Sequence, residues 1–152
     1  MVLGIGNTLL QDEGAGVHAM RRLQRESADF AGVEFMDGGT LSFSLAGPVG
    51  DVDCLLVIDA AELGGPPGSV EVYSGCEMDR FLGANRKRSV HEVGLLDLLA
   101  VTHLTDNLPP RRALIGIQPA VLDWGEFPSA AVAQALPLAC ARARELILGW
   151  QA

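Results

Sequence analysis

The sequence of 152 residues is short of cysteine. Its three cysteines, Cys54, Cys76 and Cys140, form neither an even set nor a C-x-x-C pair. A disulfide framework or a structural zinc site normally needs such a set, so we expect reduced cysteines that mostly serve packing. Because 49% of the residues are hydrophobic, the fold can instead rely on a buried apolar core.

Basic residues are also scarce, since 11 Lys and Arg face 19 Asp and Glu and the formal net charge is −8. This balance argues against the basic surface that nucleic acids or anionic membranes require. No apolar run approaches the roughly 18 residues of a membrane-spanning helix, and no basic segment follows Met1 as in a secretory signal. We therefore expect a cytoplasmic protein with neither a nucleic-acid nor a membrane partner.

Along the sequence, short apolar runs alternate with longer amphipathic stretches. This alternation predicts a single domain over residues 1–152 with an α/β fold: a three-layer αβα sandwich around a mostly parallel sheet of about five strands. The expected strands are 2–6, 33–36, 54–58, 70–74 and 112–118, with 70–74 as a half-exposed antiparallel edge. The expected helices are 14–25, a short one from 41 to about 47, 90–104 and 129–150.

Three titratable side chains are expected to meet at one edge of this sheet. Parallel strands place their carboxyl ends on one rim, where ligands usually bind. Asp59 ends the most hydrophobic run, and in a flavodoxin-like strand order, 2-1-3-4-5, it would face the loop 7–13 that carries Glu13. His91 begins a later helix and can reach the same rim. Two carboxylates and an imidazole can bind a divalent metal ion and leave coordination positions open.

Each of these residues also has a purely structural interpretation. Asp12 and Glu13 could complement a helix dipole as acids of a first turn, and Asp59 could cap a turn. His91 could cap or pack the start of its helix. An acid at the end of such an apolar strand is nevertheless costly to bury without a partner, and the convergence of all three residues favours a site.

Several other motifs do not support a site. Gly4-x-Gly6 is not a dinucleotide fingerprint, because Leu9 stands where the third glycine should be, and we expect no organic cofactor. No serine lies in a nucleophile elbow and there is no H-E-x-x-H helix. The basic run 86–88 is typical of a solvated loop, although it could also bind a peptide carboxylate.

Four ordered motifs together resemble those of the nickel-iron hydrogenase maturation proteases. They are Gly4-Ile5-Gly6-Asn7-Thr8-Leu9-Leu10-Gln11-Asp12-Glu13-Gly14-Ala15-Gly16-Val17, Asp37-Gly38-Gly39-Thr40, Val57-Ile58-Asp59-Ala60 and Ser89-Val90-His91-Glu92-Val93-Gly94-Leu95, and the similarity extends to Gly116-Ile117-Gln118-Pro119. The resemblance implies a small α/β sandwich. It also implies an endopeptidase that removes a short C-terminal extension from the precursor of the hydrogenase large subunit after nickel insertion.

Carried over by motif, the family's metal-contacting residues fall on Glu13, Asp59 and His91. The resemblance implies that the nickel belongs to the substrate, so that an open three-ligand site would let metal status control cleavage. Our mechanistic hypothesis is that nickel contact positions the scissile bond and that a metal-polarised water or carbonyl assists its hydrolysis. Glu92, next to His91, could tune the histidine from outside the metal's own ligands.

The residues of the second motif are expected to shape the rim beside the site. Gly38 and Gly39 would permit a turn with positive φ, and Thr40 could cap the following helix. Two other functions stay open for the protein as a whole. One is a nickel-binding maturation chaperone without proteolytic activity that uses the same three ligands. The other is a zinc hydrolase of small substrates, against which the missing H-E-x-x-H weighs.

Overall fold

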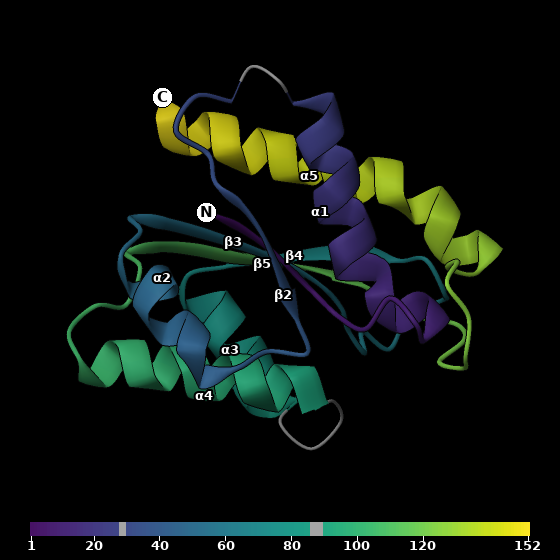
Figure 1. Cartoon of the computed structure of the whole chain (residues 1–152), viewed down its shortest axis with the longest axis horizontal. Coiled ribbons are helices and arrows are strands. Elements are labelled where there is room, and N and C mark those ends of the chain that lie inside the picture. Colours follow the sequence, from purple (N-terminus) through teal and green to yellow (C-terminus); the bar gives the residue numbers. More distant parts are fainter. Residues whose placement is uncertain (28–29, 86–89) are drawn as a thin grey trace.

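The computed structural model describes residues 1–27, 30–85 and 90–152, without the side chains of residues 90–93. A five-stranded sheet lies between two layers of helices (Figure 1), which confirms the predicted α/β three-layer sandwich. The strand order is β2-β1-β3-β5-β4, with β4 antiparallel to β5 and the other pairs parallel. The strands are β1 Val2–Ile5, β2 Phe35–Gly39, β3 Cys54–Ala60, β4 Val70–Ser74 and β5 Arg111–Ile117.

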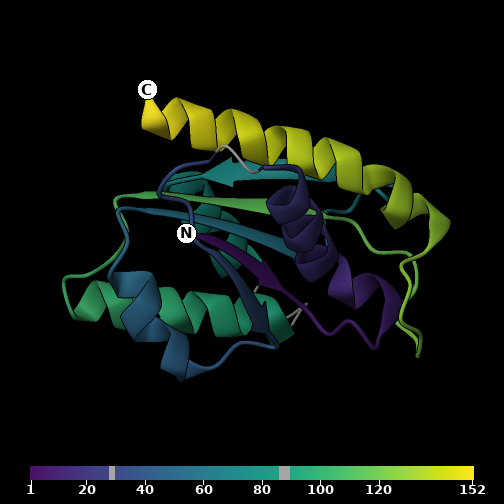
Figure 2. The ribbon, with the colours of Figure 1, turned by 45° about the horizontal axis from the view of Figure 1, so that its top comes forward.

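The helices divide between the two faces of the sheet (Figure 2). The longest helix, α5 (Ala130–Gln151), shares one face with α1 (Ala15–Glu26), and α2 (Ala46–Gly50), α3 (Cys76–Ala84) and α4 (Val90–Leu104) cover the other. Two 3₁₀ turns, η1 (Gln11–Gly14) and η2 (Phe43–Leu45), lead into α1 and α2. In the described part of the chain, none of the helices has the length and apolar character needed to cross a membrane.

The central strand β3 shows which face of the sheet each side chain occupies. Leu56 and Ile58 belong to the core under α1 and α5, whereas Leu55 and Val57 belong to the core under α2, α3 and α4. Because side chains alternate along a strand, Asp59 is directed to the same face as Leu55 and Val57. The backbone alternation alone therefore turns Asp59 toward the α4 layer.

Strand order and strand ends differ in part from expectation. β1 lies beside β3, as in the flavodoxin-like order, and β4 is an antiparallel edge strand, as predicted, but β5 lies between β3 and β4, so the order is 2-1-3-5-4 rather than 2-1-3-4-5. The buried β3 also does not end at Asp59: it continues to Ala60, and Asp59 lies opposite Gly116 in the β5 ladder. The reason is that β5 extends equally far and supplies hydrogen-bond partners to the end.

Other local differences concern β2, α2 and α3. β2 starts later than predicted and includes Asp37 and Gly39, because its parallel ladder with β1 runs to Gly39. The next cap is Ser42, whose hydroxyl accepts the Ser44 N–H at 3.2 Å, so the prediction for Thr40 is wrong. The helix that follows, α2, passes through Pro48, which is tolerated in a first turn. The short helix α3 was not predicted.

Candidate functional site

Glycines bring the loop after β1 onto the carboxyl-terminal rim of the sheet. A Cβ on Gly16, in the first turn of α1, would lie 2.0 Å from the Ile58 carbonyl oxygen and 2.5 Å from that of Ile5. Gly6 has φ +134°, and a Cβ there would lie 1.8 Å from the carbonyl oxygen of Glu13. Any larger residue would push the backbone away. The glycine spacing therefore seats η1 directly on the ends of β1 and β3.

Glu13 and Asp59 are the two predicted site residues whose side chains the structure describes. Glu13 lies in η1 and Asp59 in β3, and these two elements contact each other. Asp59 is 1% exposed, and the oxygens Glu13 Oε2 and Asp59 Oδ1 are both buried. Carboxylates are rarely buried unless other groups or a metal ion compensate their charge. The rim thus concentrates buried acidic oxygens where ligands of parallel sheets usually bind.

His91 lies in the first turn of α4, and its side chain is outside the described residues. The direction of α4 is clear from its two ends. Gly94 adjoins Leu41, just after β2, whereas Asn107, just after α4, adjoins Gly50, before β3. The helix therefore runs opposite to the parallel strands, and its N-terminus lies at the same rim as Asp59.

The complete set of three ligands stays a prediction. Among the side chains that the structure describes, no group of three His, Cys, Asp or Glu could hold a metal ion. The alternative interpretation of Asp59, a side chain that caps a following turn, also stays open, although its backbone lies inside β3 opposite Gly116 of β5. The predicted role of Glu92 and the basic run 86–88 fall outside the described residues.

Asp12 has a structural role that the sequence did not indicate. Its buried carboxylate accepts hydrogen bonds from the N–H groups of Ala120, Val121 and Ser129 at 2.8, 2.9 and 2.6 Å. The Ser129 hydroxyl also donates to it, at 2.8 Å. Burial by itself would raise the pKa of Asp12, but these hydrogen bonds outweigh it and lower the pKa below its ordinary value. Asp12 thus ties the loop 118–129 to η1.

The positive-φ turn beside the rim is confirmed at Gly39, which has φ +51°. Gly38 is needed for a different reason, because a Cβ there would lie 2.9 Å from the Leu3 side chain. The neighbouring Asp37 carboxylate accepts the Gly39 N–H at 3.0 Å and pairs with Arg21 at 2.9 Å. These contacts fix the end of β2 next to the loop that leads to α2.

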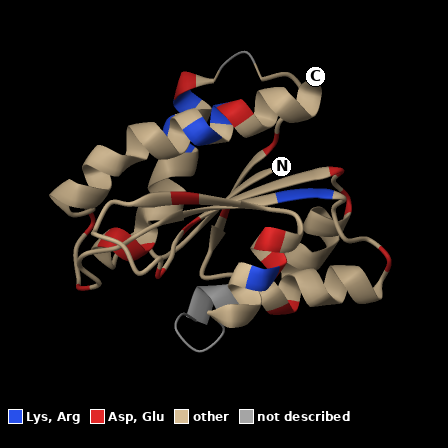
Figure 3. Cartoon of the chain, turned by 180° about the vertical axis from the view of Figure 1, so that it is seen from behind, with Lys and Arg blue, Asp and Glu red and all other residues tan. Residues whose placement is uncertain are grey.

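Charge is distributed unevenly over the molecule (Figure 3). The described basic side chains lie mostly on α1 and α5, at Arg21, Arg22, Arg25, Arg142 and Arg144. The others are Arg80 in α3 and Arg111 and Arg112 at the start of β5. Residues 1–20 and 113–141, which form η1, the end of β5 and the loop 118–129, contain no Lys or Arg. These described segments around Glu13 therefore carry acidic and apolar side chains without Lys or Arg.

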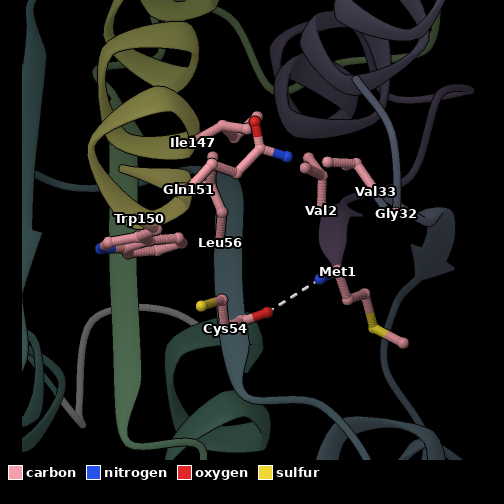
Figure 4. A pocket seen from close by; sticks show the side chains of 9 residues that line it. All are labelled: Met1, Val2, Gly32, Val33, Cys54, Leu56, Ile147, Trp150 and Gln151. Atoms are coloured by element: carbon pink, nitrogen blue, oxygen red, sulfur yellow. Dashed lines mark hydrogen bonds between the residues drawn. The ribbon is translucent and has the colours of Figure 1, made fainter. Parts of the chain in front are cut away.

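A separate apolar hollow of about 120 Å³ lies at the opposite end of the strands (Figure 4). Val2, Leu56, Ile147 and Trp150 are among its lining residues, and the Met1 ammonium donates to the Cys54 carbonyl oxygen at 2.8 Å beside it. Cys54 and Val2 begin β3 and β1, so this hollow is at the amino-terminal edge of the sheet. It has no part in the rim site.

Solved structures that are similar to this chain include hydrogenase-maturing endopeptidases. HybD from Escherichia coli aligns with a TM-score of 0.84 and 29% identity over 93% of this chain and 87% of its own. The [NiFe] hydrogenase maturation protease HybD from Thermococcus kodakarensis aligns with a TM-score of 0.79 and 29% identity over 96% of this chain and 97% of its own. The fold is thus the small α/β scaffold that these hydrogenase-maturing endopeptidases share.

Sequence comparison names the family. The family model described as hydrogenase maturation protease matches residues 17–146, a range that includes Asp59 and His91 but not Glu13. HupD of Rhizobium leguminosarum bv. viciae is 36% identical over 151 residues, which cover 99% of this chain and 74% of that protein. The chain belongs to the hydrogenase maturation protease family.

The relatives differ from this chain in length. HupD of Thiocapsa roseopersicina is 42% identical over 123 residues, 81% of this chain but only 55% of that protein. The corresponding share is 58% for HupM of Azotobacter chroococcum mcd 1. The chain thus spans less than two thirds of the length of these curated relatives.

Proposed function

We propose that this chain is an endopeptidase that removes the C-terminal extension of a nickel-iron hydrogenase large-subunit precursor after nickel insertion. Membership of the maturation protease family supports the reaction class. The observation that carries the proposal is that buried Asp59 and half-buried Glu13, each with a buried carboxylate oxygen, come from contacting elements on the rim where the first turn of α4 carries His91. No other part of the described structure combines these features.

The donor types at this rim suit nickel held by the substrate. Imidazole is a good ligand for nickel, and carboxylate oxygens can complete its coordination sphere. Three protein ligands would leave positions open for groups of the precursor itself. We therefore propose Glu13, Asp59 and His91 as both metal-contacting and catalytic residues, with nickel supplied by the substrate protein and no organic cofactor.

The protein's own contribution to catalysis is positioning. Glu13 and Asp59 are held on rigid elements, so a precursor whose metal ion they contact is fixed relative to the rim. A coordinated divalent ion can polarise a carbonyl or acidify water. This chemistry would take the place of a serine or cysteine nucleophile. Contact with the metal would thereby couple nickel insertion to cleavage.

The test is an assay with purified precursor in two forms, nickel-loaded and nickel-free, followed by intact-mass measurement. We expect the chain to shorten only the loaded form. Equal shortening of both forms would contradict nickel recognition. Nickel binding to this chain without any mass change in the precursor would favour the chaperone, and tightly held zinc after purification without added metal would favour the zinc hydrolase. Cytoplasmic location stays a prediction.

A further inference from the structure

Four large apolar side chains stand exposed beside the rim. Phe127 is 80% exposed, Trp124 75%, Leu122 62% and Leu9 51%. Three of them come from the loop 118–129, and the fourth comes from the loop after β1. Backbone hydrogen bonds join the two loops. We call these four residues the rim apolar surface. Soluble proteins rarely gather large apolar side chains in water unless the patch contacts a partner.

This surface is held in place by backbone hydrogen bonds rather than by its own side chains. Gln11 N–H donates to the Gly125 carbonyl oxygen at 2.8 Å, and Gly125 N–H donates to that of Leu9 at 2.9 Å. The Asp12 carboxylate holds both ends of the same loop, at Val121 and Ser129. A surface ordered before binding loses little conformational freedom when a partner covers it.

The margin of the surface is acidic. Asp123 and Glu126 alternate with the exposed aromatic residues and are themselves exposed. No Lys or Arg occurs anywhere in residues 113–141. The complementary partner is therefore an apolar segment flanked by Lys or Arg.

The surface is continuous with the candidate site. Leu10 and Gly125 form a parallel bridge, and Glu13 follows three residues after Leu10. A folded protein that offers its metal ion to Glu13 would therefore lie close to this loop. A single partner would thus contact both the candidate site and the rim apolar surface. The proposed function supplies that partner, the precursor.

We propose that Leu9, Leu122, Trp124 and Phe127 form the docking surface for an apolar, Lys- or Arg-flanked segment of the large-subunit precursor, next to the metal that Glu13 contacts. This inference rests on the proposed function and adds the means by which the folded precursor is recognised. The aromatic pair would supply most of the binding energy, because Trp and Phe each bury about 150–250 Å² and Trp is enriched among interface hot spots.

The first experiment measures cleavage of the nickel-loaded precursor by the double variant Trp124→Ala/Phe127→Ala. We expect KM to rise at least about tenfold while kcat changes by less than about twofold, because binding is lost but the rim is not. The matched control is Leu104→Ala/Leu148→Ala. These leucines are 82% and 56% exposed and lie near the C-terminal ends of α4 and α5. The control should leave KM within about twofold of wild type.

The second experiment measures binding without cleavage. The chain has two tryptophans, so Trp150→Phe leaves Trp124 as its only tryptophan, whose emission is read after subtraction of the emission of the precursor alone. Addition of nickel-loaded precursor should shift its emission to shorter wavelength as the indole leaves water. The charge-reversal variant Asp123→Lys/Glu126→Lys should weaken this binding at least about fivefold in low salt.

The outcomes separate the two proposals. Wild-type cleavage with an unchanged KM in the aromatic double variant would overturn the docking surface and leave the proposed function standing. A shift of Trp124 emission without cleavage would overturn the proteolytic function and retain the docking surface. Neither binding nor cleavage of the loaded precursor would overturn both.

Discussion

The Asp12 carboxylate accepts both the N–H and the hydroxyl of Ser129, a residue 117 positions later in the chain, at 2.6 and 2.8 Å. The same hydroxyl accepts the Val132 N–H at 3.4 Å as the N-cap of α5. One buried carboxylate therefore joins the turn that carries Glu13 to the start of the longest helix. Its neighbour in sequence, Glu13, is the residue that we propose for the rim site.

Replacing this carboxylate by an amide should destabilise the fold. In Asp12→Asn, one oxygen acceptor becomes an NH₂ group that faces N–H donors, so we expect the free energy of unfolding to fall by roughly 2–3 kcal/mol. Urea denaturation measures it. Glu126→Gln, an exposed acid on the same loop, is the control and should change the free energy by less than about 0.5 kcal/mol. Equal stability of Asp12→Asn and wild type would show that the loop is held in another way.

The pH dependence of stability should carry the signature of Asp12. Its pKa in the folded protein is lower than the ordinary value of 3.8, so ionised Asp12 stabilises the fold above that value. The contribution is lost as the pH falls below 3.8 through the lowered pKa. The difference in unfolding free energy between wild type and Asp12→Asn should thus be constant from about pH 7 to 5 and shrink below about pH 4. A difference that grows toward acid would contradict this sign.

The fit of α1 against the strand ends predicts opposite effects of alanine at two helical glycines. Gly16→Ala places a methyl group against the backbone oxygens of Ile58 and Ile5, which cannot move aside as a side chain can. We expect a loss of roughly 1–3 kcal/mol or more. Gly149→Ala, in α5 with no atom near the added Cβ, should stabilise by about 0.5–1 kcal/mol. Thermal denaturation of both variants measures the contrast.

The three proposed site residues should be needed for cleavage but not for folding. Glu13→Gln, Asp59→Asn and His91→Ala should each lower the rate of shortening of nickel-loaded precursor by at least about tenfold. Glu62→Gln, an exposed acid just beyond β3, should retain activity within about twofold. Circular dichroism checks that each variant is folded. Full activity in any of the three would remove that residue from the site.

Strands and long helices were predictable because their patterns are local. The helix from Val90 to Leu104 and the strand from Val70 to Ser74 have the expected bounds. The α3 helix was missed, although Met78 and Leu82 are buried four residues apart after the first-turn acid Glu77. That spacing and charge are the signal that could have found it.

Asp12 and the strand order depend on partners far away in sequence. The donors to Asp12 lie on Ala120, Val121 and Ser129, so only the docked loop distinguishes it from an acid that complements a helix dipole. The position of β5 beside β3 likewise depends on tertiary contacts, because either β4 or β5 could pair with β3 as far as local sequence patterns show. For the site, the backbone places η1, the end of β3 and the start of α4 at one rim, and the convergence of Glu13, Asp59 and His91 there stays a prediction. The ligand roles stay predictions.

The position of Asp59 inside β3, rather than in a loop beyond it, has a consequence for selectivity. Its main chain is paired with β5 opposite Gly116 and the residue is 1% exposed, so the carboxylate is held at a fixed place on the rim. If Asp59 contacts the metal ion as we propose, the incoming protein must bring the ion to this fixed position. Under that proposal, the rigid strand would favour a correctly assembled centre over an immature or misfolded one.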